Sequence, residues 1–405
     1  MSILTFFSGS YCGKASIISD VIDQSGFKLL SDNDLVASAA RLSGMSENKI
    51  ARSFLEKTSV FNKFTHEKER AIAYLRLAMA ELMSQDNCVI DGFTSLLVPA
   101  SISHVLRICL IADKAFRIKQ AMQAQNLSEK DAANLILKND ESCSAWSNTL
   151  YKIADPWDAS LYDMLLPTDK MTKDEAVSLI LENLKNEVIQ STKASRKAAD
   201  DFALAARVAV ALSKEGHNVD VSARDGLVTL TINTKVLLLG KLEEELKNIA
   251  QQVEGVSSVE TRIGKGFYQA DIYRRFDFEV PSKVLLVDDE REFVQTLSER
   301  LQMREMGSAI AYDGESALNL VKEDEPDVMI LDLKMPGIDG IEVLKKVKAS
   351  RPEIEVIILT GHGSEADREI CMKLGAFAYL QKPVDIEELS RNLKAANEKI
   401  QQKQN

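Results

Sequence analysis

Five polar side chains in the C-terminal part of the chain have the types and the order that phosphoryl chemistry uses: Asp288, Asp289, Asp332, Thr360 and Lys382. Clustered carboxylates repel one another unless a hard divalent cation such as Mg²⁺ takes oxygen ligands from them. One carboxylate of such a cluster can act as a nucleophile, and the metal, an ammonium and a hydroxyl can share the charge of the phosphoryl group. The set predicts phosphorylation of an aspartate, with Asp332 as the acceptor.

Each of these side chains follows an apolar run, which indicates that strands of one sheet position them. The runs cover residues 283–287, 327–331, 355–359 and 376–380. Continuous Val, Ile and Leu runs are typical of parallel strands with helices on both faces, and such sheets bind ligands beyond the carboxyl ends of their strands. Alone, any of the five residues would be an ordinary polar residue at a strand end. The ordered set on successive strands favours a site.

Residues 283–405 resemble a two-component receiver domain through the acid pair, Asp332-Leu333-Lys334-Met335-Pro336-Gly337, Thr360-Gly361 and Lys382-Pro383. The resemblance implies a flavodoxin-like doubly wound (βα)5 fold of strand order 2-1-3-4-5, with residues 308–312 as an edge strand. It also implies site roles. Mg²⁺ would be held by Asp288, Asp289, Asp332 and the backbone carbonyl of Lys334. Lys382 would pair with the phosphoryl group, and Thr360 and Tyr379 would form a switch pair.

Length and charge limit the alternatives. The 405 residues allow two or three domains. Fifty Lys and Arg against 61 Asp and Glu give a net charge of -11, which disfavours binding to DNA or to an anionic membrane surface. The five cysteines are scattered and never spaced as Cys-x-x-Cys, which is typical of a reduced cytoplasmic protein without structural zinc. We expect no transmembrane segment, because no apolar run is long enough.

The first residues of the chain have the layout of a phosphate-binding loop. A short apolar strand at residues 3–7 leads to a loop that contains Gly9, Gly13 and Lys14, and a helical pattern follows. Loop amides and a helix N-terminus in that order can face an anion, so Gly13 and Lys14 are candidate ligands of a nucleotide phosphate. The motif departs from a Walker loop, because three residues separate the glycines and Ala15 follows Lys14. A phosphate site and an ordinary strand-helix turn remain open at this point.

Residues 1–187 continue with alternating strand and helix patterns and resemble the cytidylate-kinase-like family of P-loop nucleoside monophosphate kinases, through Tyr162-Asp163 and Thr168-Asp169. The resemblance implies a parallel α/β fold and binding of ATP or another nucleotide. Three departures predict that phosphotransfer is weak or lost. Tyr11 and Cys12 crowd the loop, residues 139–144 hold no lid arginine, and Phe93 stands where the family tends to have arginine.

Residues 188–265 predict a polar linker helix at 190–201, a helix from Phe202, and then a small α+β unit of order α-β-β-α-β. Alternating residues on both sides of Asp225-Gly226 indicate a hairpin, and a helix is expected from about residue 235 to 253. The unit resembles a BON domain. The absence of a basic or aromatic cluster favours a packing or dimerisation module over a phospholipid-binding one. Residues 266–282 would be a connector whose aromatic side chains dock on a neighbouring domain.

The sequence as a whole predicts a multidomain α/β protein: a response regulator of a phosphorelay that takes its phosphoryl group from a sensor histidine kinase or a phosphotransfer protein. Because only a helix at residues 385–405 follows the receiver strands, the signal is expected to run from Thr360 and Tyr379 to the connector at 268–278, to the earlier domains or to a second subunit. Two alternatives remain: a receiver-regulated nucleoside monophosphate kinase, and an adaptor that senses a nucleotide without turnover. Whether the chain is a homo-oligomer stays open.

Overall fold

The computed structural model describes residues 2–404 except for 56–58, 60, 85–86, 235, 237–238, 265–266, 268–282, 305 and 362. The predicted connector therefore lies outside the described residues, apart from Phe267. The chain forms two compact units: Met1–Thr58 with Glu67–Tyr273, and Ser59–His66 with Arg274–Asn405. We refer to them as the N-terminal unit and the C-terminal unit. Among the described residues, no helix combines the length and the apolar character needed to cross a membrane.

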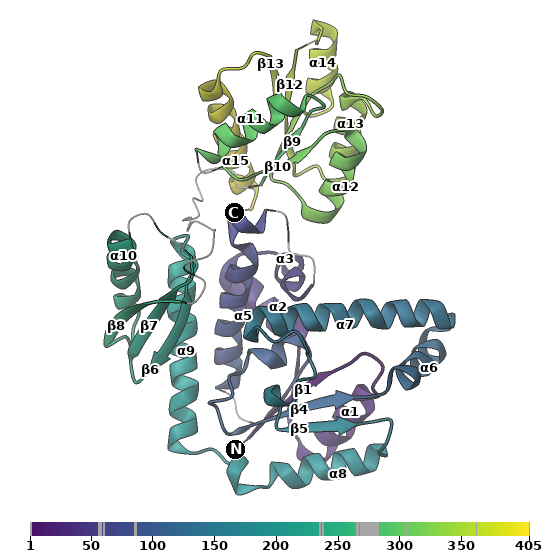
Figure 1. Ribbon diagram of the computed structural model, residues 1–405, viewed down its shortest axis with the longest axis vertical. Coiled ribbons are helices and arrows are strands. Elements are labelled where there is room, and N and C mark those ends of the chain that lie inside the picture. Colours follow the sequence, from purple (N-terminus) through teal and green to yellow (C-terminus); the bar gives the residue numbers. More distant parts are fainter. Residues whose placement is uncertain are drawn as a thin grey trace. The chain divides into compact units, whose positions relative to one another are not determined.

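A parallel sheet of five strands, in the order β2-β3-β1-β4-β5, forms the centre of the N-terminal unit (Figure 1). The strands are β1 (Ile3–Ser8), β2 (Lys28–Ser31), β3 (Cys88–Asp91), β4 (Val105–Ile111) and β5 (Met164–Pro167). Alternate residues of β1 enter different cores: Leu4 and Phe6 pack with α1 and α8, whereas Ile3 and Phe7 pack with α2 and α5. Helices thus cover both faces, which accounts for the continuous apolar strands.

The helical elements around this sheet follow in chain order. They are α1 (Lys14–Ser25), α2 (Asp32–Ser43), α3 (Glu47–Ala51), η1 (Arg52–Phe54), α5 (Glu67–Met83), η2 (Phe93–Leu97), α6 (Lys114–Gln125), α7 (Glu129–Tyr151), η3 (Ala159–Leu161), α8 (Lys173–Leu184) and η4 (Glu187–Ile189); the short α4 (Asn62–Thr65) falls in the segment grouped with the C-terminal unit. Helix α8 begins with a capping box, in which Thr172 and Glu175 make both reciprocal hydrogen bonds.

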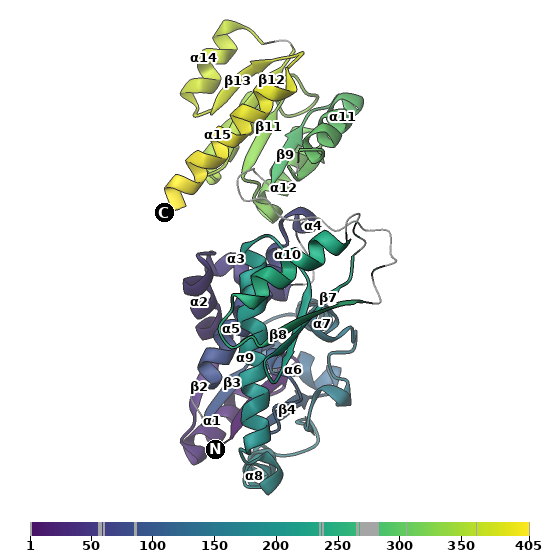
Figure 2. The same ribbon diagram turned by 90° about the vertical axis from the view of Figure 1, so that its left-hand side faces the viewer.

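One continuous helix, α9 (Lys193–Lys214), runs where the sequence suggested a polar linker helix followed by a second helix. It packs along α5 (Figures 1 and 2), and Ala198, Ala199 and Phe202 contact the core of the first sheet. Its other side places Leu204 and Val208 in the core of the small sheet. The two helices expected at 190–201 and from Phe202 are therefore one. Its basic residues Lys193, Arg196 and Lys197 are exposed, as in a polar linker helix, whereas the alanines between the charged residues pack against α5, a contact that their weak apolar signal did not indicate.

The small sheet has the predicted α-β-β-α-β order, with α9 and α10 (Leu239–Gln251) packed on it (Figure 2). Its strands are β6 (Asp220–Arg224), β7 (Leu227–Ile232) and β8 (Ser258–Ile263). β6 and β7 pair antiparallel and β8 pairs parallel to β7. Asp225 and Gly226 both have positive φ, 56° and 78°, as a two-residue type I′ hairpin turn requires.

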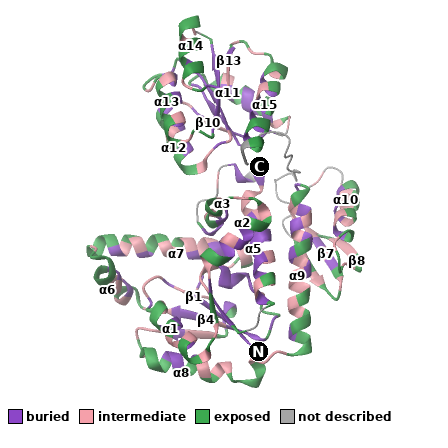
Figure 3. Ribbon diagram, turned by 180° about the vertical axis from the view of Figure 1, so that it is seen from behind, coloured by how far each residue is buried: buried purple, intermediate pink, exposed green. Residues whose placement is uncertain are grey.

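The sheet of the C-terminal unit is parallel and has the order β10-β9-β11-β12-β13, which is the predicted 2-1-3-4-5 with β10 at the edge. The strands are β9 (Val284–Val287), β10 (Ser308–Ala311), β11 (Val328–Leu331), β12 (Glu355–Thr360) and β13 (Ala378–Gln381). The helices are α11 (Arg291–Gln302), α12 (Gly314–Asp324), α13 (Gly340–Ser350), α14 (Glu365–Lys373) and α15 (Ile386–Gln404). One core joins the sheet to α12, α13 and α14 and a second joins it to α11 and α15. Figure 3 shows the strands buried and the outer sides of the helices exposed.

Candidate functional site

Three carboxylates meet at the carboxyl end of the C-terminal sheet. Leu331 of β11 pairs in register with Val287 of β9, so Asp332 and Asp288 leave their strands side by side. With Asp289 they form a group whose ligand oxygens all lie within 4.8 Å of one another. Asp288 and Asp332 are buried and Asp289 is exposed. The donor set suits a hard divalent cation, because such ions take carboxylate oxygens and need an accessible face for their remaining ligands.

Lys382 brings the positive charge to this group from the end of β13. Its Nζ lies 2.7 Å from Oδ2 of Asp288, 3.0 Å from Oε1 of Glu290 and 3.9 Å from Oδ1 of Asp332. Burial alone would lower the pKa of Lys382, but its hydrogen bonds to Asp288 and Glu290 reverse this and raise the pKa. Burial raises the pKa of Asp288, while the hydrogen bond from Lys382 opposes the rise. Lys382 is therefore a protonated cation among carboxylates.

The loop after β11 holds Asp332 in place. The amide of Lys334 donates to Oδ2 of Asp332 over 3.0 Å, which leaves the other oxygen toward Lys382. The following chain folds back so closely that a Cβ on Gly340 would lie 2.2 Å from the Asp332 carbonyl oxygen. Glycine is needed there to start α13. For Lys334 the observed contact is made by its amide; the metal-ligand role of its carbonyl stays a prediction.

The predicted switch residues lie on the two neighbouring strands β12 and β13. Thr360 is fully buried at the end of β12. The hydroxyl of Tyr379 is also buried and makes no hydrogen bond to the described residues. It lies against Gly363, where an added Cβ would be 1.6 Å from the hydroxyl and 2.8 Å from Cγ2 of Thr360. Burial raises the pKa of Tyr379. The ring of Tyr379 is thus turned inward, into space that the missing side chain of Gly363 provides.

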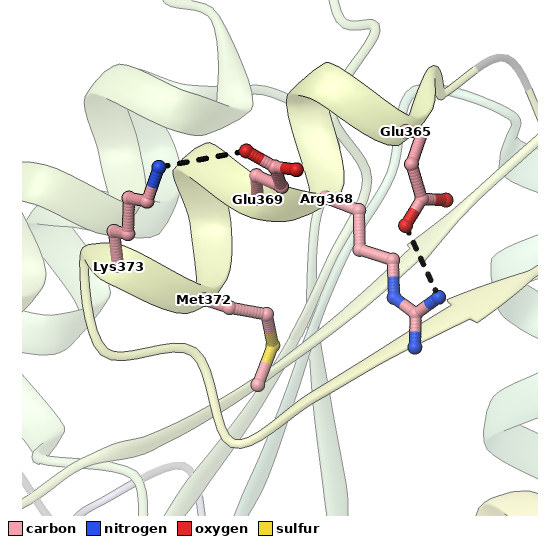
Figure 4. A pocket seen from close by; sticks show the side chains of 5 residues that line it. All are labelled: Glu365, Arg368, Glu369, Met372 and Lys373. Atoms are coloured by element: carbon pink, nitrogen blue, oxygen red, sulfur yellow. Dashed lines mark hydrogen bonds and ion pairs between the residues drawn. The ribbon is translucent and has the colours of Figure 1, made fainter.

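A shallow pocket lies on the surface of α14, and Figure 4 shows its lining side chains. They are Glu365, Arg368, Glu369, Met372 and Lys373. Their charges pair along the same helix, Arg368 with Glu365 and Lys373 with Glu369, each over 3.5 Å. Exposed pairs of this kind are weak and leave no concentrated charge, so we assign no ligand to this pocket.

In the N-terminal unit, residues 9–13 form the loop between β1 and α1. Together with Lys14, the first residue of α1, they are here called the glycine loop. The side chains of Tyr11 and Cys12, which were predicted to crowd the loop, point away from it. Cys12 is buried in the core with α1, and Tyr11, at φ 64°, packs on helices α6 and α7. Burial raises the pKa of the Cys12 thiol to about 11, so the thiol is protonated and unreactive at neutral pH. Helix α1 begins after Gly13, at φ 70°, without a side-chain cap.

Both cations at the glycine loop are paired with carboxylates. Lys14, a predicted phosphate ligand, lies with its Nζ 2.7 Å from Oδ1 of Asp91 at the end of β3. Arg117 from α6 reaches the loop from the other side, donating from Nε to the Ser10 carbonyl over 2.8 Å and from Nη2 to the Ser10 hydroxyl over 3.1 Å. The same guanidinium binds Asp140 of α7 through two bonds of 3.0 and 2.6 Å.

Arg117 was not predicted as a residue of this site. A lid arginine would be expected in residues 139–144, but that segment is acidic or neutral. That segment supplies Asp140, whereas the arginine comes from the preceding helix and contacts a loop 107 residues away. The helical spacing of Arg117 gave no indication of this contact, because only the packing of α6 on α7 brings the two segments together.

Aromatic side chains fill the space beside β1 and β3. Phe93 stacks on Phe54 with ring centroids 5.4 Å apart and meets Phe7 edge-on at 6.0 Å. The indole of Trp146 donates to the Phe93 carbonyl over 2.7 Å. The position that lacks the arginine is therefore part of the aromatic core.

The matching pairs Tyr162-Asp163 and Thr168-Asp169 lie around β5. Tyr162 is buried against Phe7, and its hydroxyl donates to the Pro156 carbonyl. Asp163 accepts two bonds from the Arg107 guanidinium, and Thr168 donates to the Ile111 carbonyl. The contacts of Asp163 and Thr168 join the segments on either side of β5 to β4.

Comparison with known protein families gives one match to each unit. Residues 284–394 match the response regulator receiver domain, and residues 3–170 match the cytidylate kinase-like family. The C-terminal unit thus contains a receiver domain of the two-component response regulators, and the N-terminal unit contains a cytidylate-kinase-like region.

Individual relatives match the receiver region. The transcriptional regulatory protein CpxR of Escherichia coli (strain K12) is 42% identical over 114 residues, which are 28% of this chain and 48% of that protein. CpxR of Klebsiella pneumoniae has the same identity and coverage. The chain thus spans about half the length of the curated relatives it matches. A receiver domain protein from Clostridium thermocellum is 34% identical, covers 30% of this chain and 97% of that one, and has a TM-score of 0.29.

Proposed function

We propose that this protein is a response regulator that accepts a phosphoryl group on Asp332 and uses it to regulate its N-terminal cytidylate-kinase-like and small α+β regions. The main support is the arrangement at the carboxyl end of the doubly wound sheet. There the ligand oxygens of three carboxylates lie within 4.8 Å of one another, and the Lys382 ammonium lies beside them. The match of residues 284–394 to receiver domains supports the reaction class. The donor would be a phosphohistidine of a sensor histidine kinase or of a phosphotransfer protein.

In the proposed reaction an Asp332 oxygen bonds to phosphorus while the bond from phosphorus to the donor nitrogen breaks and the donor histidine keeps that electron pair. The Lys334 amide fixes one Asp332 oxygen, so the oxygen toward Lys382 is the nucleophile. Lys382 then exchanges part of its contact with Asp288 and Glu290 for the new phosphoryl oxygens.

The acidic group fits Mg²⁺, and Asp288, Asp289 and Asp332 would hold it together with the Lys334 carbonyl. When bound, the ion neutralises charge on the phosphoryl oxygens and lowers the repulsion among the carboxylates. Burial of Asp288 adds to this argument, because a buried carboxylate with a raised pKa gains stability from a nearby cation.

The signal would leave the site through Thr360 and Tyr379. A phosphoryl group on Asp332 gives the Thr360 hydroxyl a charged acceptor, which draws that side chain toward the site. Thr360 then vacates space into which the Tyr379 ring, already turned inward, can move further. The surface altered by this shift comprises β13 and α15, and the receiving partner would be residues 1–282 or a second copy of the chain.

For the N-terminal region we propose weak nucleotide binding and little or no phosphotransfer. Lys14 and Arg117 are the cations of the glycine loop, and both are paired with carboxylates. The alternative function is a receiver-regulated cytidylate-like kinase, which the family match of residues 3–170 favours. A third is a nucleotide sensor. A coupled assay with ATP and CMP separates the three: turnover supports the kinase, saturable binding without turnover the sensor, and neither a structural module.

The main proposal is tested on the full chain. Incubation with acetyl phosphate and Mg²⁺, followed by intact-mass and peptide analysis, should add one phosphoryl group to the peptide that contains Asp332. Hydrogen exchange with and without beryllofluoride should then change protection in the N-terminal unit as well as around β12 and β13. Labelling without any change outside the receiver would leave a phosphoacceptor that does not regulate the rest of the chain.

A further inference from the structure

The paired helices α6 and α7 cover the glycine loop through two kinds of contact. Tyr11 of the loop packs with a small apolar cluster of Ile118, Ala121, Leu127, Ala132 and Ile136. Beside it, the Arg117 guanidinium is held between the loop and Asp140. Figure 1 shows α6 and α7 at the end of the sheet toward which β4 and β5 point. A Cβ on Gly9 would lie 3.0 Å from Cζ of Arg117, so the glycine makes room for the guanidinium.

Arg117 makes the fork-shaped contact with Asp140 that a guanidinium also makes with a phosphate. All three guanidinium nitrogens donate, two of them to the Asp140 carboxylate and two to Ser10. Arg117 is 7% exposed as a side chain and Asp140 is 30% exposed. The guanidinium is therefore fixed, whereas the carboxylate lies at the rim, where an incoming anion can replace it.

The second cation of the loop is neutralised in the same way, by the contact of Lys14 with Asp91. Asp91 lies on β3 and Asp140 on α7, so two separate elements each bring one acid to one base. Pairing of this kind removes the attraction that the loop would otherwise exert on a polyanion.

We propose that Asp140 is an internal anion that occupies the place of a ligand's phosphate at Arg117 and keeps the glycine loop closed to triphosphate groups. A ligand carrying a triphosphate binds only when Asp140 leaves Arg117. This inference rests on the proposed phosphate-binding role of the glycine loop and adds its regulation. The chemistry recognised is the triphosphate, from an inorganic chain or from a nucleotide.

The test measures binding of tripolyphosphate, ATP and CTP to the full chain by calorimetry at low ionic strength. Asp140→Asn keeps the size of the side chain and removes its charge, and Glu141→Gln, exposed on the same helix, is the matched control. We expect Asp140→Asn to bind tripolyphosphate about tenfold or more tighter than the unaltered chain, a difference of about 1.4 kcal/mol. Glu141→Gln should bind as the unaltered chain does. Adding Lys14→Ala to Asp140→Asn should remove the gain.

Three outcomes distinguish the inference from the function on which it rests. Equal affinity of the unaltered chain and Asp140→Asn would leave the glycine loop as a phosphate site and overturn the role of Asp140. No binding by either at millimolar tripolyphosphate would overturn both. Tighter binding of ATP or CTP than of tripolyphosphate would identify a nucleotide as the source of the triphosphate.

Both tryptophans of the chain, Trp146 and Trp157, lie in the N-terminal unit, so near-UV circular dichroism checks its fold. If Asp140→Asn loses that signal, Asp140→Ala, which also removes the charge that faces Arg117, replaces it in the same comparison.

Discussion

The two parallel sheets of this protein share an architecture and differ in the charge at their carboxyl ends. At the C-terminal sheet the carboxylates of Asp288, Glu290 and Asp332 all lie within 3.9 Å of the Lys382 ammonium, and Asp289 lies beside Asp288 and Asp332. At the N-terminal sheet each base has one acid of its own: Lys14 has Asp91, and Arg117 has Asp140.

The difference shows that the fold alone does not determine the chemistry. Ligands of doubly wound sheets lie beyond the carboxyl ends of the strands in both cases. Carboxylates in excess favour binding of a divalent cation. The bound cation can then contact the oxygens of a phosphoryl group. At the N-terminal sheet Lys14 and Arg117 are each paired with one carboxylate. A further carboxylate, that of Asp32, accepts hydrogen bonds from the Phe93 and Thr94 amides and from the Thr94 hydroxyl instead. In the proposed functions, the receiver end can react once Mg²⁺ is bound, whereas the glycine loop must first break the contact between Arg117 and Asp140.

The largest expected effect is at the acceptor. Asp332→Asn should abolish phosphoryl labelling by acetyl phosphate, because an amide oxygen is a poor nucleophile. Asp339→Asn, which alters an exposed cap of α13, serves as the control and should label as the unaltered chain does. Mass spectrometry of the intact chain measures both. If Asp332→Asn were labelled as strongly as the unaltered chain, the acceptor would be another residue. The contrast between the two sheet ends would then lose its chemical meaning.

The next largest effect is expected on the Mg²⁺ requirement of labelling, which should depend on the number of carboxylates at the site. Asp289→Asn removes one exposed carboxylate and leaves the two buried ones. The Mg²⁺ concentration for half-maximal labelling should rise about tenfold, since one charged ligand contributes roughly that much to a divalent site. Labelling over a Mg²⁺ series gives the value, with Glu292→Gln on α11 as the control. An unchanged Mg²⁺ requirement would mean that the surplus of carboxylates does not set the metal affinity.

A smaller effect is expected at the switch. Gly363→Ala places a Cβ where the Tyr379 hydroxyl lies, so the ring must turn outward. Because burial raises the pKa of Tyr379, exposure should lower this pKa toward its ordinary value. NMR of ring-labelled tyrosine over a pH series measures it. Gly361→Ala is the matched control, since its Cβ would meet only Lys382 side-chain carbons at 3.9 Å. A Tyr379 pKa that stays raised in Gly363→Ala would show that the ring has room elsewhere inside.

The C-terminal site was predictable because its residues sit directly after buried strands. A continuous apolar run fixes where a parallel strand ends, and register then brings Asp288 and Asp332 together without knowledge of the loops. The inward position of Tyr379 was not predictable in this way, since it depends on the path of the loop that carries Gly363.

The N-terminal site was less predictable because its contacts join distant segments. The sequence indicated the glycine loop and the missing arginine at Phe93. It gave no sign that Arg117 would meet both Ser10 and Asp140, since that geometry follows from the packing of α6 on α7. Likewise, the alanines of α9 gave no indication that this helix packs on two hydrophobic cores.

The smallest expected effect is on the melting temperatures of the two units, when a helix cap is removed from each. It tests whether the units differ only in the charges at the carboxyl ends of their sheets. Each carries a helix with the same capping box, Ser31 with Asp34 at α2 and Ser364 with Asp367 at α14. Hydrogen bonds from the serine lower the pKa of both aspartates. A lowered folded-state pKa means that the stabilisation is present above the ordinary value near 3.8 and is lost as the pH falls through the folded value.

Asp34→Asn and Asp367→Asn should therefore each lower the melting temperature of their own unit by a small and similar amount at pH 7, and by less as the pH falls below 4. Scanning calorimetry at pH 7 and at the lowest pH where the chain stays folded gives the two differences, with exposed Glu292→Gln as the control for loss of a surface charge. Similar shifts in both units would mean that helix capping works alike in the two and that their contrast lies in the charges at the sheet ends. A large shift in one unit alone would place part of that contrast in the stability of the helices themselves.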